Sequence, residues 1–402
     1  MKYSRGSEWR KWDLHVHTPD SVLNNQFTNW DEYILKLESI KDHAVIGITD
    51  YFSIDGYKKI LEYRKKGKLK NIDLLLPNIE LRILPVTRKE KSINLHVIFS
   101  NSLEISELED FLKDLKFEYK GNSYSCEKHR LIALGKAYNP NLSTEKAYKE
   151  GIEQFKTTVK DLNSIFSKNK KMKDNVIIAA SNRSGDGVSG IQHSSLAATR
   201  EEIYRFTDII FSSSKKDRLY FLGQGVDSVE EIKRKFGKLK PCIHGSDAHS
   251  LNRICYPCAR CSEHDCIVDS ANCDLRYTWI KADPTFEGLK QVIYEPEERV
   301  HIEMLPPKGK NDAKVIDKVE IKNSNNWFES VPILFNDNLV SIIGEKGAGK
   351  TALADFISLA GGDFDVKEDP VSFIFKALKS SKQIQETIEN CVVTIYWRDG
   401  SS

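Results

Sequence analysis

Short apolar stretches of strand length recur along the first 300 residues, and several of them run up to a histidine or a carboxylate. An apolar run of four to eight residues bounded by polar residues predicts a buried β-strand. The runs in question are Lys11–Thr18, Val45–Asp50, Leu74–Glu80, Ile93–Phe99, Val176–Ala180, Pro241–Ser246 and Tyr277–Ile280. Residues 101–175, between two of these runs, are polar and helix-patterned. In barrels of parallel strands the carboxyl ends of the strands meet at one face, where the chemistry collects.

The first of these strands carries His15 and His17 at alternate positions. Successive side chains of a strand point to opposite faces, so both imidazoles lie on one face, a few ångströms apart. Such a pair is half of a metal site, although surface strands also carry such pairs by chance. Further ligand-type residues follow on the other strands: Asp50, Glu80, His96, Asp247 and His249. A satisfied core histidine would explain any one of them, but five such strands together favour a metal site.

The donor types indicate which ions to expect. Clustered imidazoles and carboxylates without a thiolate favour Zn, Mn or Fe over Ca or Mg. Two such ions a few ångströms apart can bind an attacking hydroxide and the oxygens of a phosphate together. The reaction class that follows is hydrolysis of a phosphoester.

The same motifs resemble those of the PHP (polymerase and histidinol phosphatase) phosphoesterases. They are Asp13–Thr18, Gly47–Asp50, Asn78–Glu80 and Gly245–His249, and the resemblance covers about residues 11–100 and 176–300. It implies a distorted (β/α)7-type barrel that holds up to three metal ions. It also implies ligation by His15, His17, Asp50, Glu80, His96, Asp247 and His249, with Glu80 bridging two ions.

Two positions depart from the pattern of this family. Tyr51 stands where many members have histidine, and Ser181-Asn182-Arg183 stands where a later strand usually ends in His-Pro. His193 is either a substitute ligand or a loop histidine. A pair of ions is therefore expected, while a third stays open. Arg183 and His244 could contact the substrate phosphate or be structural.

A second signal begins at the apolar stretch Asn338–Ile343, which predicts a strand. Gly344-Glu345-Lys346-Gly347-Ala348-Gly349-Lys350-Thr351 follows and leads into a helical pattern, as in a complete Walker A motif. Backbone amides at Gly344, Gly347 and Gly349 would surround phosphates, Lys350 would reach the terminal phosphates, and Thr351 would hold Mg²⁺. The sequence therefore predicts a site for ATP with Mg.

The hairpin-like pair Val331–Phe335 and Leu339–Ile343 resembles the start of an SMC/RecF-type ATPase head. The one good strand after it, Val392–Tyr396, ends without acidic residues, so we expect an incomplete head in the N-terminal part of a longer protein. A PHP domain before such a head resembles the TrlF-like ATPases, as do Thr49–Gly56, Trp279–Leu289 and Tyr294–Val300. The resemblance implies a bacterial protein of nucleic-acid processing or phage defence, with a homodimer or higher oligomer formed through the head.

A third signal is a cysteine cluster between the Asp247 motif and the strand at Tyr277. Its members are Cys255, Cys258, Cys261, Cys266 and Cys273, with His264 among them. Close Cys-x2-Cys spacing supplies two thiolates of a tetrahedral zinc site. The second half lacks the usual spacing, so a structural zinc and a thiol-rich loop without metal both stay open.

Composition bounds the remaining possibilities. The 402 residues are 40% apolar and 29% charged, which predicts a soluble protein of two domains. The formal net charge of +2 argues neither for nor against binding of nucleic acid. Without a signal peptide or a membrane-length apolar run, we expect a cytoplasmic protein. The expected domains are 1–305, with a helical insertion at 101–175 and the Cys-rich insertion at 255–273, then a linker at 306–314 and the ATPase head at 315–402.

Two functions follow from the sequence. The first is metal-dependent phosphodiester hydrolysis, by a nuclease that acts on DNA or RNA and is regulated by its ATPase head. The alternative is an ATP-driven, nucleic-acid-binding SMC-like protein in which the PHP module is not catalytic.

Overall fold

The computed structural model describes residues 5–192, 194–260, 273–329 and 331–402. The chain divides into two compact units. One unit is Trp9–Pro306, and the other is Pro307–Ser402 together with the N-terminal residues up to Glu8. The boundary between the two units falls between Pro306 and Pro307. The N-terminal residues differ from the expected division, because Arg5 pairs with Asp317 at 2.9 Å in the C-terminal unit.

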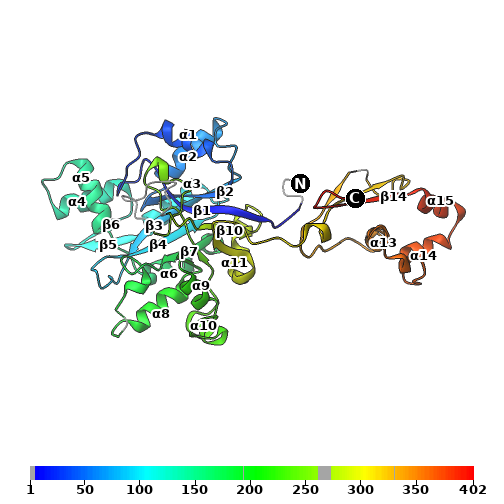
Figure 1. Ribbon diagram of the computed structural model, residues 1–402. Helices are drawn as coiled ribbons and strands as arrows, with labels where there is room; N and C mark the ends of the chain where they lie inside the picture. The colour runs from blue at the N-terminus through cyan, green and yellow to red at the C-terminus, as the bar shows by residue number, and fades with distance from the viewer. Residues whose placement is uncertain (1–4, 193, 261–272, 330) are drawn as a thin grey trace. The chain divides into compact units, whose positions relative to one another are not determined.

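The larger unit is built on one mixed β-sheet (Figure 1). As far as the chain is described, this sheet has nine strands. In spatial order they are β11 (Val300–Glu303), β10 (Tyr277–Lys281), β1 (Trp9–His17), β2 (His43–Tyr51), β3 (Leu74–Ile83), β4 (Ile93–Phe99), β7 (Val176–Ser181), β8 (Ile209–Phe211) and β9 (Cys242–Ile243). Strands β4 and β10 run opposite to the other seven. The predicted α/β class is confirmed, with a mixed rather than an all-parallel sheet.

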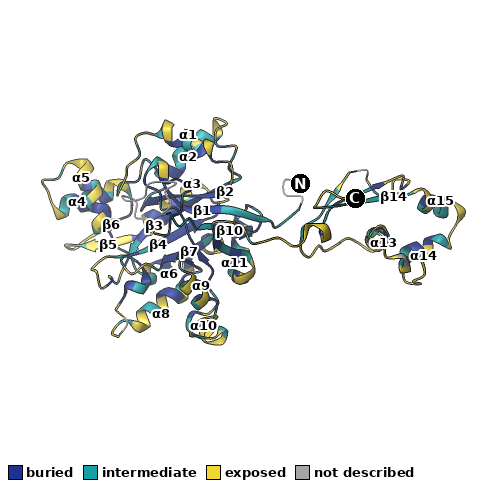
Figure 2. Cartoon of the chain, viewed as in Figure 1, coloured by how far each residue is buried: buried dark blue, intermediate teal, exposed yellow. Residues whose placement is uncertain are grey.

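The two edges of this sheet approach each other, so the sheet is nearly closed into a barrel. Thr278 of β10 joins them: its hydroxyl accepts a hydrogen bond from the His244 amide at 2.7 Å and donates one to the His244 carbonyl at 2.6 Å. His244 directly follows β9. The central strands are buried on both faces, as the continuous apolar runs predict; in β2 only Ala44 is partly exposed (Figure 2).

Helices cover the outside of the sheet. They are α1 (Trp30–Ser39), α2 (Asp55–Lys65), α3 (Ile105–Asp114), α4 (Lys128–Tyr138), α5 (Thr144–Gln154), α6 (Val159–Lys168), α7 (Lys170–Asp174), α8 (Ala197–Phe206), α9 (Lys215–Phe221), α10 (Val229–Phe236), α11 (Phe286–Tyr294) and α12 (Pro296–Arg299). Their starts follow local rules: Thr158 with Asp161 and Ser228 with Glu231 form capping boxes at α6 and α10. Short 3₁₀ turns lie at Val188–Gly190 (η1) and Leu251–Arg253 (η2).

The insertion at 101–175 is not wholly helical. Between α3 and α4 it contains a hairpin of β5 (Lys116–Tyr119) and β6 (Asn122–Ser125). The turn residues Lys120 and Gly121 both have positive φ, at 50° and 74°. A two-residue turn of that conformation matches the twist of antiparallel strands, which is why a hairpin forms here.

The smaller unit has a three-stranded antiparallel sheet with helices beside it. Its elements are β12 (Ile316–Lys322), β13 (Ile333–Leu334), β14 (Val392–Trp397), α13 (Lys350–Ala360), α14 (Phe373–Leu378) and α15 (Lys382–Asn390), with 3₁₀ turns η3 (Asp312–Lys314) and η4 (Phe364–Lys367). Within the described part of the chain, no helix is both long and apolar enough to span a membrane.

The predicted strand at Leu339–Ile343 is wrong. These residues are not in a strand, and Leu339 and Ile343 are 91% and 89% exposed. An apolar strand needs neighbouring strands to pair with and elements to cover it. The described residues place no such strand beside this segment.

Candidate metal centre

The two histidines of β1 lie side by side at the end of the strand. His15 and His17 are 7% and 0% exposed, and their Nε2 atoms are 3.2 Å apart. The alternation of the strand therefore places both imidazoles on one face, as the sequence predicts.

Two carboxylates from distant parts of the chain meet this pair. Glu80 of β3 has its Oε2 3.2 Å from His15 Nε2 and 3.3 Å from His17 Nε2. Asp247, in the loop after β9, has its Oδ1 3.1 Å and 3.6 Å from the same two nitrogens. One ligand atom from each residue lies within 4.8 Å of all the others. These four residues form the metal cluster: His15, His17, Glu80 and Asp247.

The spacing of the metal cluster fits a single divalent cation. Four ligands at about 2.1 Å from a tetrahedral ion are about 3.4 Å apart. The contacts of 3.1–3.6 Å between the cluster atoms fall around that value. Glu80 Oε1 is also buried and has no hydrogen-bond partner among the described residues, so this carboxylate retains an oxygen for a further ligand. The donor set of imidazoles and carboxylates suits a divalent metal ion.

Backbone bonds fix Asp247 against β1. The Asp247 amide donates to the His15 carbonyl at 2.9 Å, and the His17 amide donates to the Ala248 carbonyl at 3.0 Å. Asp247 has φ +51°, a conformation that non-glycine residues rarely adopt and that turns its carboxylate toward the histidines. The segment after β9 thus pairs with the end of β1 as a short extra strand.

A buried carboxylate holds the same loop from the other side. Asp13 accepts hydrogen bonds from the His15 amide at 3.1 Å and from the Ser246 amide at 3.1 Å. Gly245 packs so closely that an added Cβ would lie 2.7 Å from the Cβ of His15 and 2.9 Å from Oδ1 of Asp13. The positions of two cluster residues therefore depend on a glycine and an aspartate that are not ligands.

The charges within the metal cluster are strongly coupled. Burial opposes protonation of His17, but hydrogen bonds to Asp247 and Glu80 raise its pKa to about 9. Burial would raise the pKa of the Glu80 carboxyl, yet His15 and His17 hold this pKa well below its usual range. The buried carboxylate of Glu80 and the partly buried carboxylate of Asp247 thus require positive charge beside them, which protons or a bound cation can supply.

The other predicted ligands surround the metal cluster without joining it. His96 is directly opposite Glu80 in the β3–β4 register, and its ring centroid is 4.3 Å from that of His15. The His249 ring stacks on His17 at 3.9 Å. Burial lowers the pKa of His96 to about 3 and that of His249 to about 4, so both imidazoles are neutral. Neutral imidazole is the form that binds metals.

Asp50 is also buried beside the metal cluster, at the end of β2. Thr18 donates its hydroxyl proton to the carboxylate, at 2.9 Å and 3.0 Å from the two oxygens. Burial raises the pKa of Asp50 to about 7. The residue is therefore positioned by Thr18 rather than by the four cluster side chains.

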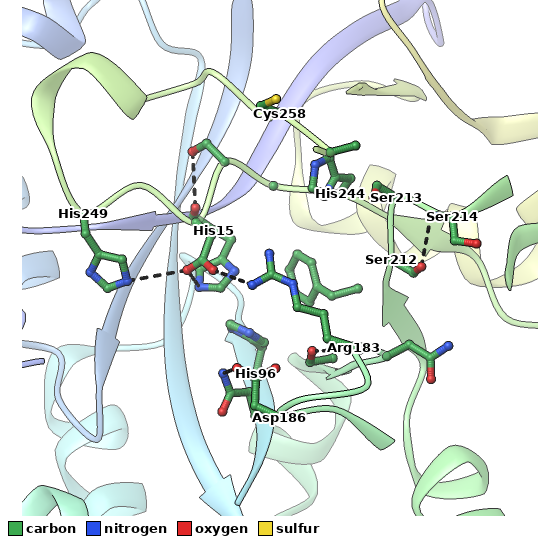
Figure 3. A pocket seen from close by; sticks show the side chains of 18 of the residues that line it. His15, His96, Arg183, Asp186, Ser212, Ser213, Ser214, His244, His249 and Cys258 are labelled. Carbon is green, nitrogen blue, oxygen red and sulfur yellow. Dashed lines mark hydrogen bonds and ion pairs between the residues drawn. The ribbon is translucent and has the colours of Figure 1, made fainter. Parts of the chain in front are cut away.

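A cavity of about 600 Å³ opens over the metal cluster (Figure 3). Arg183, from the loop after β7, is 59% exposed and reaches Asp247, with its NH1 3.1 Å from Oδ2. His244 lines the same cavity, and its Nε2 has no hydrogen-bond partner among the described residues. Ser212, Ser213 and Ser214 after β8 form another part of the wall. The mouth of this site is polar and basic.

Three lining arginines were missed from the sequence: Arg82, Arg253 and Arg260. Arg82 lies two residues after Glu80 on β3, so strand alternation could have placed it on the same face. Arg253 gives no comparable signal. Its environment depends on how the loop after Asp247 folds.

The two departures from the PHP pattern are well accommodated. The Tyr51 hydroxyl lies 3.4 Å from Nε2 of His249. The Asn182 side chain donates to Asp217 at 2.7 Å and accepts from the Tyr204 hydroxyl at 2.6 Å. Tyr51 thus faces the site, whereas Asn182 belongs to a network between β7 and the neighbouring helices.

The cysteine cluster is only partly described. Cys255 and Cys258 are buried and Cys273 is half-buried. Cys261, His264 and Cys266 lie outside the described residues, as does His193. Within the described ranges the metal-type grouping contains no cysteine. The structural zinc therefore stays a prediction.

The Walker A segment curls before α13 as the sequence predicts. Gly347 and Gly349 have φ of +89° and +84°, which glycine adopts without strain, and α13 begins at Lys350. Lys350 Nζ donates to the carbonyls of Gly344 and Glu345, both at 2.8 Å. Thr351 follows at the second position of the helix. Whether this loop binds ATP stays a prediction.

Fold and site together define an α/β, barrel-like protein with a buried cluster that could hold a divalent metal, followed by a smaller P-loop unit. Residues 318–402 match the family model described as an AAA domain. No curated protein matches the chain.

Two solved structures are similar to the chain. One is endonuclease Q in complex with a 27-mer duplex that has an abasic lesion at the active site: 11% identity, TM-score 0.41, covering 73% of this chain and 58% of that one. The other is a proposed metal-dependent phosphoesterase from Bifidobacterium adolescentis: 12% identity, TM-score 0.29, covering 60% of this chain and 89% of that one. This chain thus spans less than two thirds of the endonuclease Q structure.

Proposed function

We propose that this protein is a metal-dependent phosphoesterase that cleaves phosphodiester bonds in DNA or RNA. The observation that carries the proposal is the convergence of His15, His17, Glu80 and Asp247 beneath a polar cavity. A divalent ion bound there would lower the pKa of a bound water and neutralise charge on a phosphate. The resemblance to PHP phosphoesterases supports the same reaction class.

The residues have distinct roles in this proposal. The metal cluster supplies ligands, and Asp50, His96 and His249 are the candidates for further ligands to a second or third ion. His96 and His249 are suited to ligation because burial keeps them neutral. Zn, Mn and Fe are the ions that this mixture of donors favours.

Arg183 is the proposed contact to the phosphate of the substrate. Its side chain is 59% exposed and contacts Asp247, so it can bind a ligand in the cavity while it keeps its ion pair with Asp247. An arginine recognises phosphate through two parallel N–H donors. Arg82, Arg253 and Arg260 add positive charge to the same cavity, which suits a polyanion such as nucleic acid.

The smaller unit is proposed to bind ATP with Mg and to regulate cleavage. Its support is the loop from Gly344 to Thr351, folded before a helix. Dimerisation through this head, membership of the TrlF-like group and a role in phage defence belong to the proposal through resemblance alone. A cytoplasmic location belongs to it through the sequence expectation alone.

The test is cleavage by purified protein supplied with Mn²⁺ or Zn²⁺. Substrates are single- and double-stranded DNA, RNA and bis(p-nitrophenyl) phosphate. We expect His15→Ala combined with His17→Ala to abolish metal loading and cleavage together. His129→Ala, which removes an exposed histidine on α4, is the matched control.

Two outcomes would reject the enzymatic proposal. In one, the wild-type protein carries no metal and cleaves none of the substrates. In the other, the double variant cleaves as fast as wild type. ATP-dependent binding of nucleic acid without cleavage would instead support the alternative, an SMC-like machine whose barrel is not catalytic.

A further inference from the structure

Arg253 is a buried arginine in the wall of the cavity over the metal cluster. It ends the short turn η2, in the loop that follows His249, and is 3% exposed. Its amide donates to the Ser250 carbonyl at 3.1 Å, and its carbonyl accepts from the Tyr256 amide at 2.9 Å. The backbone on both sides is thus fixed, and the side chain lines the same cavity as His15 and Asp247.

Two of the three nitrogens of the Arg253 guanidinium have no acceptor among the described residues. Its Nε and NH1 are buried and have no hydrogen-bond partner within the described part of the chain. Two neighbouring arginines do have acceptors: Arg276 donates to the Ser213 carbonyl and to Asp274, and Arg183 donates to Asp247. Arg82 in the same cavity wall resembles Arg253 in part, because its Nε is also buried without a partner among the described residues. A guanidinium cannot lose its proton in a protein, so burial without an acceptor is costly. An anionic ligand in the cavity would remove that cost.

A second unsatisfied group lies in the same wall. His244 Nε2 is buried without a partner among the described residues, and the residue lines the cavity together with Arg253. Two polar groups held buried without partners around one cavity indicate a polar ligand rather than an apolar one.

We propose that Arg253 binds a second phosphate group of the substrate, next to the one that lies at the metal cluster. Arg183 forms an ion pair with Asp247 of the metal cluster. Arg253 offers separate donors in the wall of the same cavity, whose volume is about 600 Å³. In this proposal the ligand presents one phosphate to Arg183 and a second phosphate to Arg253. This inference rests on the proposed function and narrows it to a nucleic-acid strand with consecutive phosphates rather than an isolated phosphomonoester.

The first experiment measures binding without catalysis. Metal-free protein in EDTA is heated with thymidine 3′,5′-bisphosphate or with thymidine alone, and the Tm is recorded. We expect the bisphosphate to raise the Tm of wild type and of Arg205→Met, an exposed arginine on α8, but not of Arg253→Met. Without ligand, Arg253→Met should be at least as stable as wild type, because the variant removes two buried donors that have no partner among the described residues.

The second experiment measures specificity. Thymidine dinucleotides with and without a 5′-terminal phosphate are cleaved in the presence of Mn²⁺. We expect the kcat/KM of wild type to be about 10- to 100-fold higher for the phosphorylated substrate, which is the fold-change that one hydrogen bond to a charged group typically provides. Arg253→Met should lose the preference and Arg253→Lys should retain part of it.

The outcomes separate the two proposals. An unchanged preference in Arg253→Met, or no rise in Tm of the wild type, overturns the role of Arg253 even if cleavage occurs. A marked loss of stability in Arg253→Met, restored in Arg253→Lys with the bisphosphate response intact in both variants, shows a structural arginine and also overturns it. Absence of all cleavage rejects the proposed function, while the Tm measurement still decides whether Arg253 binds phosphate.

Discussion

Gly245→Ala should damage the metal cluster although it leaves all four residues of the cluster unchanged. The added Cβ would lie 2.7 Å from the Cβ of His15 and 2.9 Å from Oδ1 of Asp13. Ordinary contact begins near 3.4 Å, so His15 or the loop must move by about 0.7 Å. Metal–ligand distances tolerate only about 0.2 Å, so a shift of that size takes a ligand out of range.

The size of the effect follows from two terms. Overpacking a buried site costs about 1–3 kcal/mol of stability. Displacing a group that orients a ligand costs about 10- to 100-fold in metal affinity. The assays are urea unfolding in EDTA for stability and calorimetric titration with Zn²⁺ for affinity. Gly185→Ala is the control, because an added Cβ there meets no atom within 4 Å.

The reasoning would be refuted if Gly245→Ala bound Zn²⁺ as tightly as wild type. It would also be refuted if stability and affinity fell equally in Gly185→Ala, because packing against His15 would then not be the cause. A loss of affinity with stability intact would show that the strain is relieved by moving the imidazole alone.

Three further predictions concern other parts of the chain. Burial lowers the pKa of Lys240 from 10.5 to about 7. Between these two pH values the unfolded chain binds one more proton than the folded chain, so the free energy of unfolding rises with pH, by up to about 1.4 kcal/mol per pH unit. Urea unfolding between pH 7 and 10.5 should show a smaller rise for Lys240→Met than for wild type. Lys350→Ala should weaken ATP binding at least about tenfold by fluorescence titration, since Lys350 is the charged group of the Walker A loop, and equal affinity would contradict this. Cys258→Ser should lower zinc content by about one ion per chain in elemental analysis, and unchanged stoichiometry would exclude the structural zinc.

Much of the site could be predicted because it depends on local order. Alternation puts His15 and His17 on one face whatever surrounds them, and the continuous apolar runs of β2 and β3 predict strands buried on both faces. The convergence of Glu80 and Asp247 on that face needs only that their strands belong to one sheet.

The direction of β4 could not be inferred from its apolar pattern, because an apolar run is the same in either direction. The length of the connection between β3 and β4 does indicate the direction of β4. Only residues 84–92 separate β3 from β4, and a parallel pair needs a dozen or more residues for its crossover. The reversal places His96 opposite Glu80 in the middle of a strand rather than at its carboxyl end.

Other features depend on tertiary surroundings that no local pattern encodes. Leu339–Ile343 is as apolar as a buried strand, but burial requires covering elements, and the described residues leave Leu339 and Ile343 exposed. The unsatisfied donors of Arg253 are likewise a property of the folded loop, since the residue type alone predicts an exposed side chain.

The pairing of Ala248 with the end of β1 has a consequence for the order of events during synthesis. His15 and His17 leave the ribosome early, but the backbone and the carboxylate that complete their site are made about 230 residues later. At 5–20 residues per second the delay is roughly 10–50 s. For most of that time His15, His17 and Glu80 have been made, but the fourth member of the metal cluster, Asp247, has not. Completion of the metal cluster is therefore a late step, because it requires the segment at Asp247 and Ala248 to pair with the end of β1.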